Sequence, residues 1–224
     1  MKKILMSLAL LLIVPIMFTA CGQDLQQKCK DNIADIRYNY FEGETENWRI
    51  SLTSGMRESP YNYDGKAGEL VEFSFVSISA KNNAPNIGYA YQVDINDETL
   101  EGMFEQSPYD ENNYGVDLGQ KVNDTDEIYV YVNNGQTSEV AKLECVSVNF
   151  QLNAEQALEQ AINEVQNDIL SKLSGNFEVY VKVISDEDKT IDTKFWYVLF
   201  TDENGGEITV IIDPNTKQII LKKV

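Results

Sequence analysis

The sequence predicts a mainly β protein whose C-terminal part adds one helix packed on an antiparallel sheet of three or four strands. Short runs that alternate apolar and polar residues, separated by turn residues, fill residues 33–150. After Leu152 the apolar residues recur at helical spacing, and alternating runs return from Phe177 to the C-terminus. We therefore expect an antiparallel β-sandwich at residues 33–150 and an α+β domain at residues 151–224.

The first of these segments contains the more numerous strands. Alternation is clearest around Val71, Phe73 and Phe75, which point to one face, and turn residues such as Asp64-Gly65 and Asn133-Asn134-Gly135 separate the runs. The number and length of the runs favour an Ig-like sandwich. The expected strands cover residues 36–41, 48–53, 69–80, 89–95, 127–132 and 140–150.

The second segment begins with the best-defined helix of the chain. Asn153 can cap its N-terminus together with Gln156, apolar residues then repeat through Leu173, and Gly175 is placed to end it. Strands are expected at residues 177–183, 194–201, 207–213 and 218–224, with a turn at residues 186–188. An amphipathic helix of this kind covers one face of a small antiparallel sheet.

Residues 1–20 have the composition of a secretory leader. Lys2 and Lys3 precede an uncharged apolar stretch, residues 4–17, and small residues follow it. The apolar stretch is short for a membrane span, which needs about 20 residues.

The end of this leader, Phe18-Thr19-Ala20-Cys21, resembles the lipobox of bacterial lipoproteins, although Phe18 stands where Leu is usual. The resemblance implies that Cys21 receives diacylglycerol and becomes the first residue of the mature protein. Lipid on Cys21 would anchor the chain to the cell membrane at its extracytoplasmic face, since two acyl chains give stable anchoring. The polar residues that follow predict a lipidated tether at residues 21–32.

Composition excludes several classes of function. The formal charge is -18, and loss of Lys2 and Lys3 with the leader brings it to -20, which argues against nucleic acid as a partner. The chain has no histidine, so Ser-His-Asp and Cys-His mechanisms and His-containing zinc sites are excluded. We predict no catalytic residue, no metal site and no cofactor, and interpret the chain as non-enzymatic.

Two cysteines remain beside Cys21. Cys29 and Cys145 could form a disulfide in an oxidising compartment, closing a long loop. Alternatively, Cys145 is a buried free thiol of a strand and Cys29 lies on the tether. The sequence leaves both open, because it does not give the distance between the two residues.

Residues 152–224 resemble a PepSY domain. The matching parts are the opening helix at Asn153-Ala154-Glu155-Gln156-Ala157 and the turn with its last strand at residues 212–219. Two features depart from the family: Lys217 stands where Gly is frequent, and residues 166–176 are longer than usual. The resemblance implies a non-catalytic module that binds or restrains extracellular peptidases, and hence an extracytoplasmic protein partner. Residues 33–150 resemble no family that we recognise.

The alternative function is a ligand-binding lipoprotein whose acidic loops hold calcium or a glycan. Residues 94–105 place acidic residues at several EF-hand positions, but Thr99 stands where the loop needs glycine. Acidic loops also occur at residues 110–113 and 123–127. Tyr61 and Tyr63 flank a turn, and such tyrosines either bind a ligand or partner or pack at the edge of the sandwich core.

Overall fold

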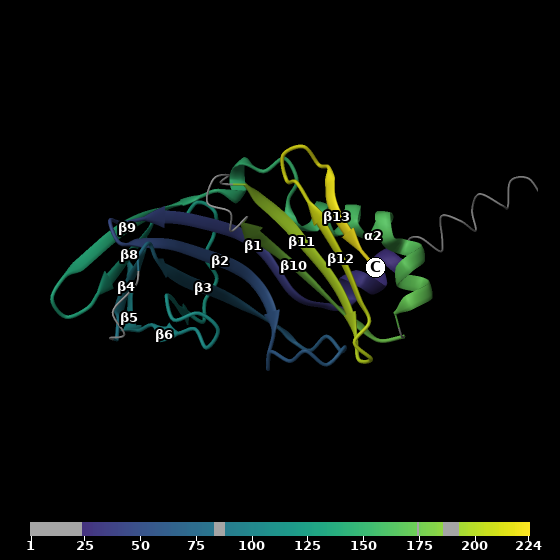
Figure 1. Cartoon of the computed structure of the whole chain (residues 1–224), viewed down its shortest axis with the longest axis horizontal. Coiled ribbons are helices and arrows are strands. Elements are labelled where there is room, and N and C mark those ends of the chain that lie inside the picture. Colours follow the sequence, from purple (N-terminus) through teal and green to yellow (C-terminus); the bar gives the residue numbers. More distant parts are fainter. Residues whose placement is uncertain (1–23, 83–87, 174, 186–192) are drawn as a thin grey trace, which may run out of the picture.

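The computed structural model describes residues 24–82, 88–173, 175–185 and 193–224, and within them it confirms a mainly β protein with one main helix. Figure 1 shows the strands, with helix α2 (Ala154–Lys172) near one end of the longest axis. The strands are β1 (Ile33–Glu44), β2 (Trp48–Glu58), β3 (Leu70–Ala80), β4 (Ala90–Ile95), β5 (Glu98–Met103), β6 (Glu105–Gln106), β7 (Asn113–Asp117), β8 (Ile128–Asn133), β9 (Ser138–Cys145), β10 (Phe177–Ser185), β11 (Lys194–Asp202), β12 (Glu207–Ile212) and β13 (Ile219–Lys223).

The strands form a long main sheet and a smaller second sheet. The main sheet has the order β13-β12-β11-β10-β1-β2-β3-β7-β6, and the second has the order β5-β4-β8-β9. Pairing of β1 with β9, where Phe41 lies opposite Cys145, joins the two sheets at one side. Between them lies an apolar core that includes Trp48, Leu52 and Val130. The expected sandwich-like arrangement is therefore present.

Strand β1 belongs to both predicted segments of the chain. Its first residues pair in parallel with β10, with Ile33 opposite Val179, and almost its whole length pairs antiparallel with β2. The four C-terminal strands, β10 to β13, are antiparallel to one another. The sheet of the C-terminal segment thus continues without interruption into the sandwich.

Helix α2 covers one face of β10, β11 and β12. Asn153 and Gln156 form a capping box at its N-terminus, as predicted, and the last helical residue is Lys172, shortly before Gly175. Its apolar side packs on a core that contains Trp196, whose Nε1 donates a hydrogen bond of 2.7 Å to the carbonyl oxygen of Leu152. Both tryptophans, Trp48 and Trp196, are core residues.

The segment predicted to be a polar tether is helical instead. Residues 24–31 form a short N-terminal helix, and its Leu25 and Cys29 are buried in the same core as α2. These two residues are four positions apart and so share one face of a helix. The tether prediction is therefore corrected for this stretch: its polar composition describes only the outer face of a docked helix.

Candidate functional site

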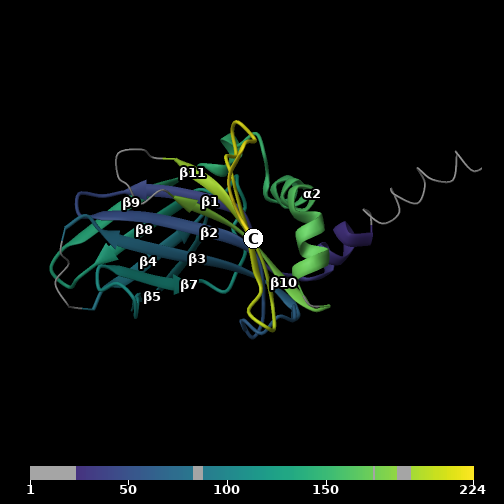
Figure 2. The same ribbon diagram turned by 45° about the vertical axis from the view of Figure 1, so that its right-hand side comes forward.

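One face of the main sheet is left largely open. On β2, Met56 contacts the core beneath α2 and Leu52 contacts the core of the sandwich, and these side chains point to the same face because they are four residues apart. Helix α2 and the second sheet therefore cover the same face (Figures 1 and 2). Over the opposite face lies the loop between β2 and β3, residues 59–69, which we call the 59–69 loop.

Two buried carboxylates hold the 59–69 loop on the sheet. Glu58 accepts hydrogen bonds from the backbone N–H of Asn62 (3.1 Å) and of Gly68 (2.8 Å). Glu178 of β10 accepts one from the backbone N–H of Lys66 (3.2 Å). Both carboxylates are almost fully excluded from solvent, so these donors replace the water that burial removes.

Gly65 brings the loop against the hairpin between β11 and β12. Its φ is +80°, a conformation that residues with a side chain rarely adopt. A Cβ atom at this position would lie 2.3 Å from the backbone nitrogen of Glu203. The turn that the sequence predicts at Asp64-Gly65 thus has a second role as a packing contact.

The loop places two exposed tyrosines over a buried one. Tyr61 and Tyr63 are 48% and 57% exposed, and their ring centroids lie 6.3 Å and 5.7 Å from that of Tyr180. The Tyr180 hydroxyl donates to Glu178 (2.9 Å), and burial followed by this hydrogen bond raises the pKa of Tyr180. The Tyr63 hydroxyl donates to Glu207 (2.9 Å). Contacts with Tyr180 and Glu207 therefore hold the two exposed rings in place on the sheet.

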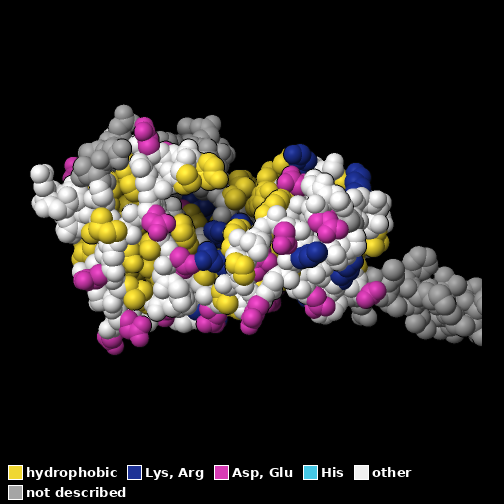
Figure 3. All heavy atoms as spheres, turned by 90° about the horizontal axis from the view of Figure 1, so that it is seen from below, with side chains coloured by type: hydrophobic (Ala, Val, Ile, Leu, Met, Phe, Trp, Pro, Cys, Tyr) yellow, Lys and Arg dark blue, Asp and Glu magenta, His cyan; other side chains and the backbone are white. Residues whose placement is uncertain are grey.

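Beside the tyrosines lies a network of charged groups. Asp35 is buried, and its carboxylate forms ion pairs with the Arg37 guanidinium (3.3 Å) and the Lys182 ammonium (3.2 Å). Lys182 also donates to the Tyr61 hydroxyl at 3.0 Å and lies 5.0 Å from the ring centroid of Tyr180. Seen from below, Lys and Arg side chains gather in a hollow in the middle of the molecule (Figure 3).

The open face continues toward the edge strand as an apolar row. The row starts at Lys182 of β10 and continues through its cross-strand neighbours, which are Tyr197 of β11, Ile211 of β12 and Leu221 of β13. Tyr197 and Ile211 are half-buried, and Leu221 is 47% exposed. We call the surface formed by Tyr61, Tyr63, Lys182, Tyr197, Ile211 and Leu221 the tyrosine face.

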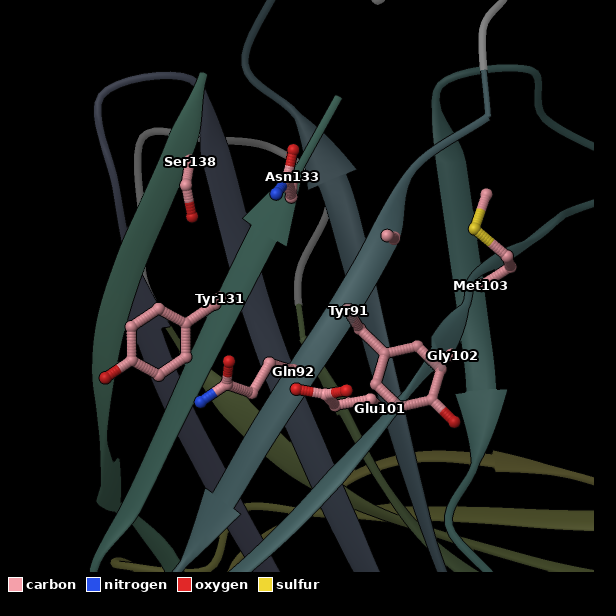
Figure 4. A pocket seen from close by; sticks show the side chains of 9 residues that line it. Tyr91, Gln92, Glu101, Gly102, Met103, Tyr131, Asn133 and Ser138 are labelled. Carbon is pink, nitrogen blue, oxygen red and sulfur yellow. The ribbon is translucent and has the colours of Figure 1, made fainter. Parts of the chain in front are cut away.

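A second candidate site is a shallow depression on the outer face of the second sheet. Its volume is about 490 Å³, and Tyr131, Gln92 and Glu101 form a row across β8, β4 and β5 (Figure 4). The Gln92 amide donates to Asp94 at 3.0 Å, which fixes its orientation. The depression is lined by Ala90, Tyr91, Gln92, Glu101, Gly102, Met103, Tyr131, Asn133 and Ser138.

The structure bears differently on the predictions made for the three cysteines. Cys21 lies outside the described residues. Cys29 and Cys145 are free thiols, which excludes the disulfide in this structure. They belong to different cores, since Cys29 is buried beneath α2 whereas Cys145 packs against the sandwich core. Burial raises the pKa of the Cys29 thiol to about 12.

The acidic loops use their carboxylates within their own turns. Residues 94–105 do not form an EF-hand loop, because strands β4 and β5 pair there as a hairpin. Asp110 accepts from the backbone N–H of Asn112 (2.9 Å) and the amide of Asn113 (2.7 Å). Asp126 accepts from the backbone N–H of Asn123 (2.7 Å). Within the described part of the chain, no three acidic or cysteine side chains are grouped as metal ligands would be.

Sequence reasoning found part of the tyrosine face. It singled out Tyr61 and Tyr63 beside a turn, but it missed the buried carboxylates that position them, because Glu58 and Glu178 look like ordinary strand residues. Among the described helices, none has the length and apolar character needed to cross a membrane. No family model, no curated protein and no solved structure matches the chain.

Proposed function

We propose that the chain is a non-enzymatic, lipid-anchored protein of the bacterial cell envelope that binds a protein partner on the extracytoplasmic side through the tyrosine face. The observation that carries this proposal is the open sheet face, on which two exposed tyrosines lie over the buried Tyr180 and beside the ion pair of Lys182 with the buried Asp35. The lipobox-like residues at Cys21 support the anchor. The resemblance of residues 152–224 to PepSY domains supports a protein, with a peptidase as the first candidate.

The chemistry of the tyrosine face suits a protein partner. Tyrosine and arginine are the residues that most often dominate binding energy at interfaces, and apolar neighbours such as Ile211 and Leu221 exclude water around them. Tyr61 and Tyr63 lose little conformational freedom on binding, because the loop that carries them is already fixed by Glu58 and Glu178.

The proposal is tested by capture from envelope and culture extracts with a soluble form of the chain that lacks Cys21, residues 22–224. We expect a partner that is retained by the unchanged chain and lost by the double variant Tyr61→Ala/Tyr63→Ala. Tyr109→Ala is the matched control, because Tyr109 is 96% exposed on a loop of the sandwich far from β10 in the sheet order. Equal retention by both variants would exclude the tyrosine face as the binding surface.

The anchor is tested separately. The chain expressed with its leader should carry lipid mass and sediment with membranes, and Cys21→Ala should release it. A Cys21→Ala protein that still sediments with membranes, beside an unchanged chain without lipid mass, would disprove the anchor and leave the binding experiment unaffected.

A glycan-binding lipoprotein is the second candidate function, and the depression on the second sheet favours it over calcium binding. Tyr131 supplies an aromatic ring beside the polar side chains of Gln92 and Glu101, a combination that suits a sugar ring and its hydroxyls (Figure 4). A ligand of the native state raises the melting temperature. Cell-wall glycan fragments should therefore raise it in the unchanged chain but not in Tyr131→Ala.

A further inference from the structure

The docked N-terminal helix fixes how far the body of the protein can move from its anchor. This helix begins at residue 24, only three residues after Cys21. Three residues of fully extended chain span at most about 11 Å. A free tether through residue 32 would have allowed a much wider range. The anchor point therefore stays close to the first turn of the helix.

The direction of this helix identifies which end of the molecule carries the anchor. The Gln26 amide donates to Asn163 (3.3 Å), and the Lys30 ammonium contacts Glu159 (2.9 Å). Gln26 thus contacts a later residue of α2 than Lys30 does, so the N-terminal helix runs antiparallel to α2. Its first residue therefore lies toward the C-terminal end of α2.

The sandwich contains the part of the protein that lies farthest from α2. In Figure 1 the N-terminal helix and α2 occupy one end of the longest axis, and the hairpin between β8 and β9 occupies the other. The last turn of α2 also carries Leu170, which is 63% exposed. An apolar side chain at this position is compatible with a lipid surface.

We infer that the C-terminal end of α2 faces the bilayer surface, and that the β8–β9 hairpin is the part of the protein farthest from the membrane. This inference rests on the proposed anchor at Cys21. The end of α2 would face the lipid headgroups, because only a short connection links Cys21 to the docked helix. The sandwich, including the depression on its second sheet, is consequently presented away from the membrane.

Energy transfer to acceptor-labelled lipid tests this orientation. The lipidated chain is reconstituted in phosphatidylcholine vesicles that contain a trace of acceptor lipid. A donor dye is placed at Ser171→Cys, next to the end of α2, or at Gln136→Cys, in the β8–β9 hairpin; both positions are exposed. The background is Cys145→Ser, and Cys29 stays unlabelled because it is buried. We expect several-fold more transfer from position 171 than from position 136.

A lengthened tether provides the control. Insertion of twelve Gly and Ser residues between Gln23 and Asp24 adds a flexible span of about 20 Å. This insertion should reduce transfer from position 171 toward the value at position 136. Equal transfer from both positions without the insertion would overturn the orientation while the lipid mass on Cys21 still supports the anchor. Absence of lipid mass would instead overturn the anchor, and with it the orientation.

Discussion

At Gly65 the 59–69 loop passes too close to the β11–β12 hairpin to leave room for a methyl group. We expect Gly65→Ala to lower the free energy of unfolding by about 3 kcal/mol, because the cost of a left-handed backbone adds to the cost of overpacking. Gly119→Ala is the matched control: its φ is +67°, but no atom lies within 4 Å of the added Cβ. The control should cost about 1 kcal/mol. Urea unfolding measures both values.

The same pair of variants bears on binding. If the 59–69 loop positions Tyr61 and Tyr63, Gly65→Ala should also weaken capture of the partner at temperatures where the protein remains folded. Gly119→Ala should leave capture unchanged. Similar stability losses in the two variants would show that the loop is not packed against Glu203 as described.

The thiol of Cys29 provides a second prediction at the level of single residues. Burial raises its pKa to about 12 from an ordinary value of 9.0, so the native state keeps the proton that the unfolded state has already lost in this range. Stability from this group is fully present below pH 9 and is lost as the pH rises from 9 to 12. Unfolding followed between these pH values should show a steeper loss for the unchanged mature chain than for Cys29→Ala.

Reactivity distinguishes the two free thiols of the mature chain. In residues 22–224, Cys145 should react with a thiol reagent faster than Cys29, because Cys145 is partly exposed whereas Cys29 is fully buried. Unfolding without reductant should release two reactive thiols. A count of zero under those conditions would show that the disulfide forms after all.

Among the structural elements, β1 decides whether the C-terminal segment can fold alone. Residues 152–224 lack β1, which pairs with β10, and they also lack the N-terminal helix that supplies Leu25 and Cys29 to the core of α2. We expect the isolated 152–224 fragment to show no cooperative thermal transition, whereas residues 22–224 unfold in one. A cooperative transition of the fragment would show that the shared strand is dispensable. Circular dichroism on heating measures this directly.

Elements with strong local signals were predictable from the sequence. Helix α2 combines a capping pair at Asn153 and Gln156 with regular apolar spacing, and both features are present in the structure. Strand β10 alternates because Phe177, Val179, Val181 and Val183 all face the core beneath α2. In β3 the alternating Val71, Phe73 and Phe75 predicted a strand, but the residues that contact the sandwich core are Val76 and Ile78 of the opposite face. The fold class followed from these elements.

Other elements depended on contacts between distant residues. The N-terminal helix contains only two buried apolar residues, Leu25 and Cys29, too few for a periodic signal. Strands β5 and β7 are short, and β5 carries acidic residues that suggested a loop. The parallel pairing of β1 with β10 has no local signature, and this is why the sequence indicated two separate sheets.

The tyrosine face was predictable only in part, for the same reason. Tyr61 and Tyr63 stood out by their residue type and their position beside a turn. Asp35, Glu58 and Glu178 became significant only when the fold buried them next to backbone N–H groups or cations. Their role depends on tertiary neighbours, which the order of residues along a strand does not reveal.

At the scale of the whole molecule, net charge should influence stability. The formal charge is -18 for the full chain and -20 for residues 22–224, which lack Lys2 and Lys3. Like charges on a compact body repel one another, and salt screens this repulsion. We expect the melting temperature of residues 22–224 to rise between about 0.01 M and about 0.15 M sodium chloride. A fall would show that favourable ion pairs, such as that of Lys182 with Asp35, outweigh the repulsion.

The shared strand also affects the time at which the protein can fold. Ile33 pairs with Val179, so 146 residues (179 minus 33) separate the two partners along the chain. Contacts over such distances form late, because the loop between them must close first. If the chain is exported as proposed, its N-terminal part emerges first, and β1 then has β2 and β9 as partners before β10 emerges. During that interval the part of β1 that pairs with β10, residues 33–36, has an open edge, which would expose the nascent chain to chaperones and proteases.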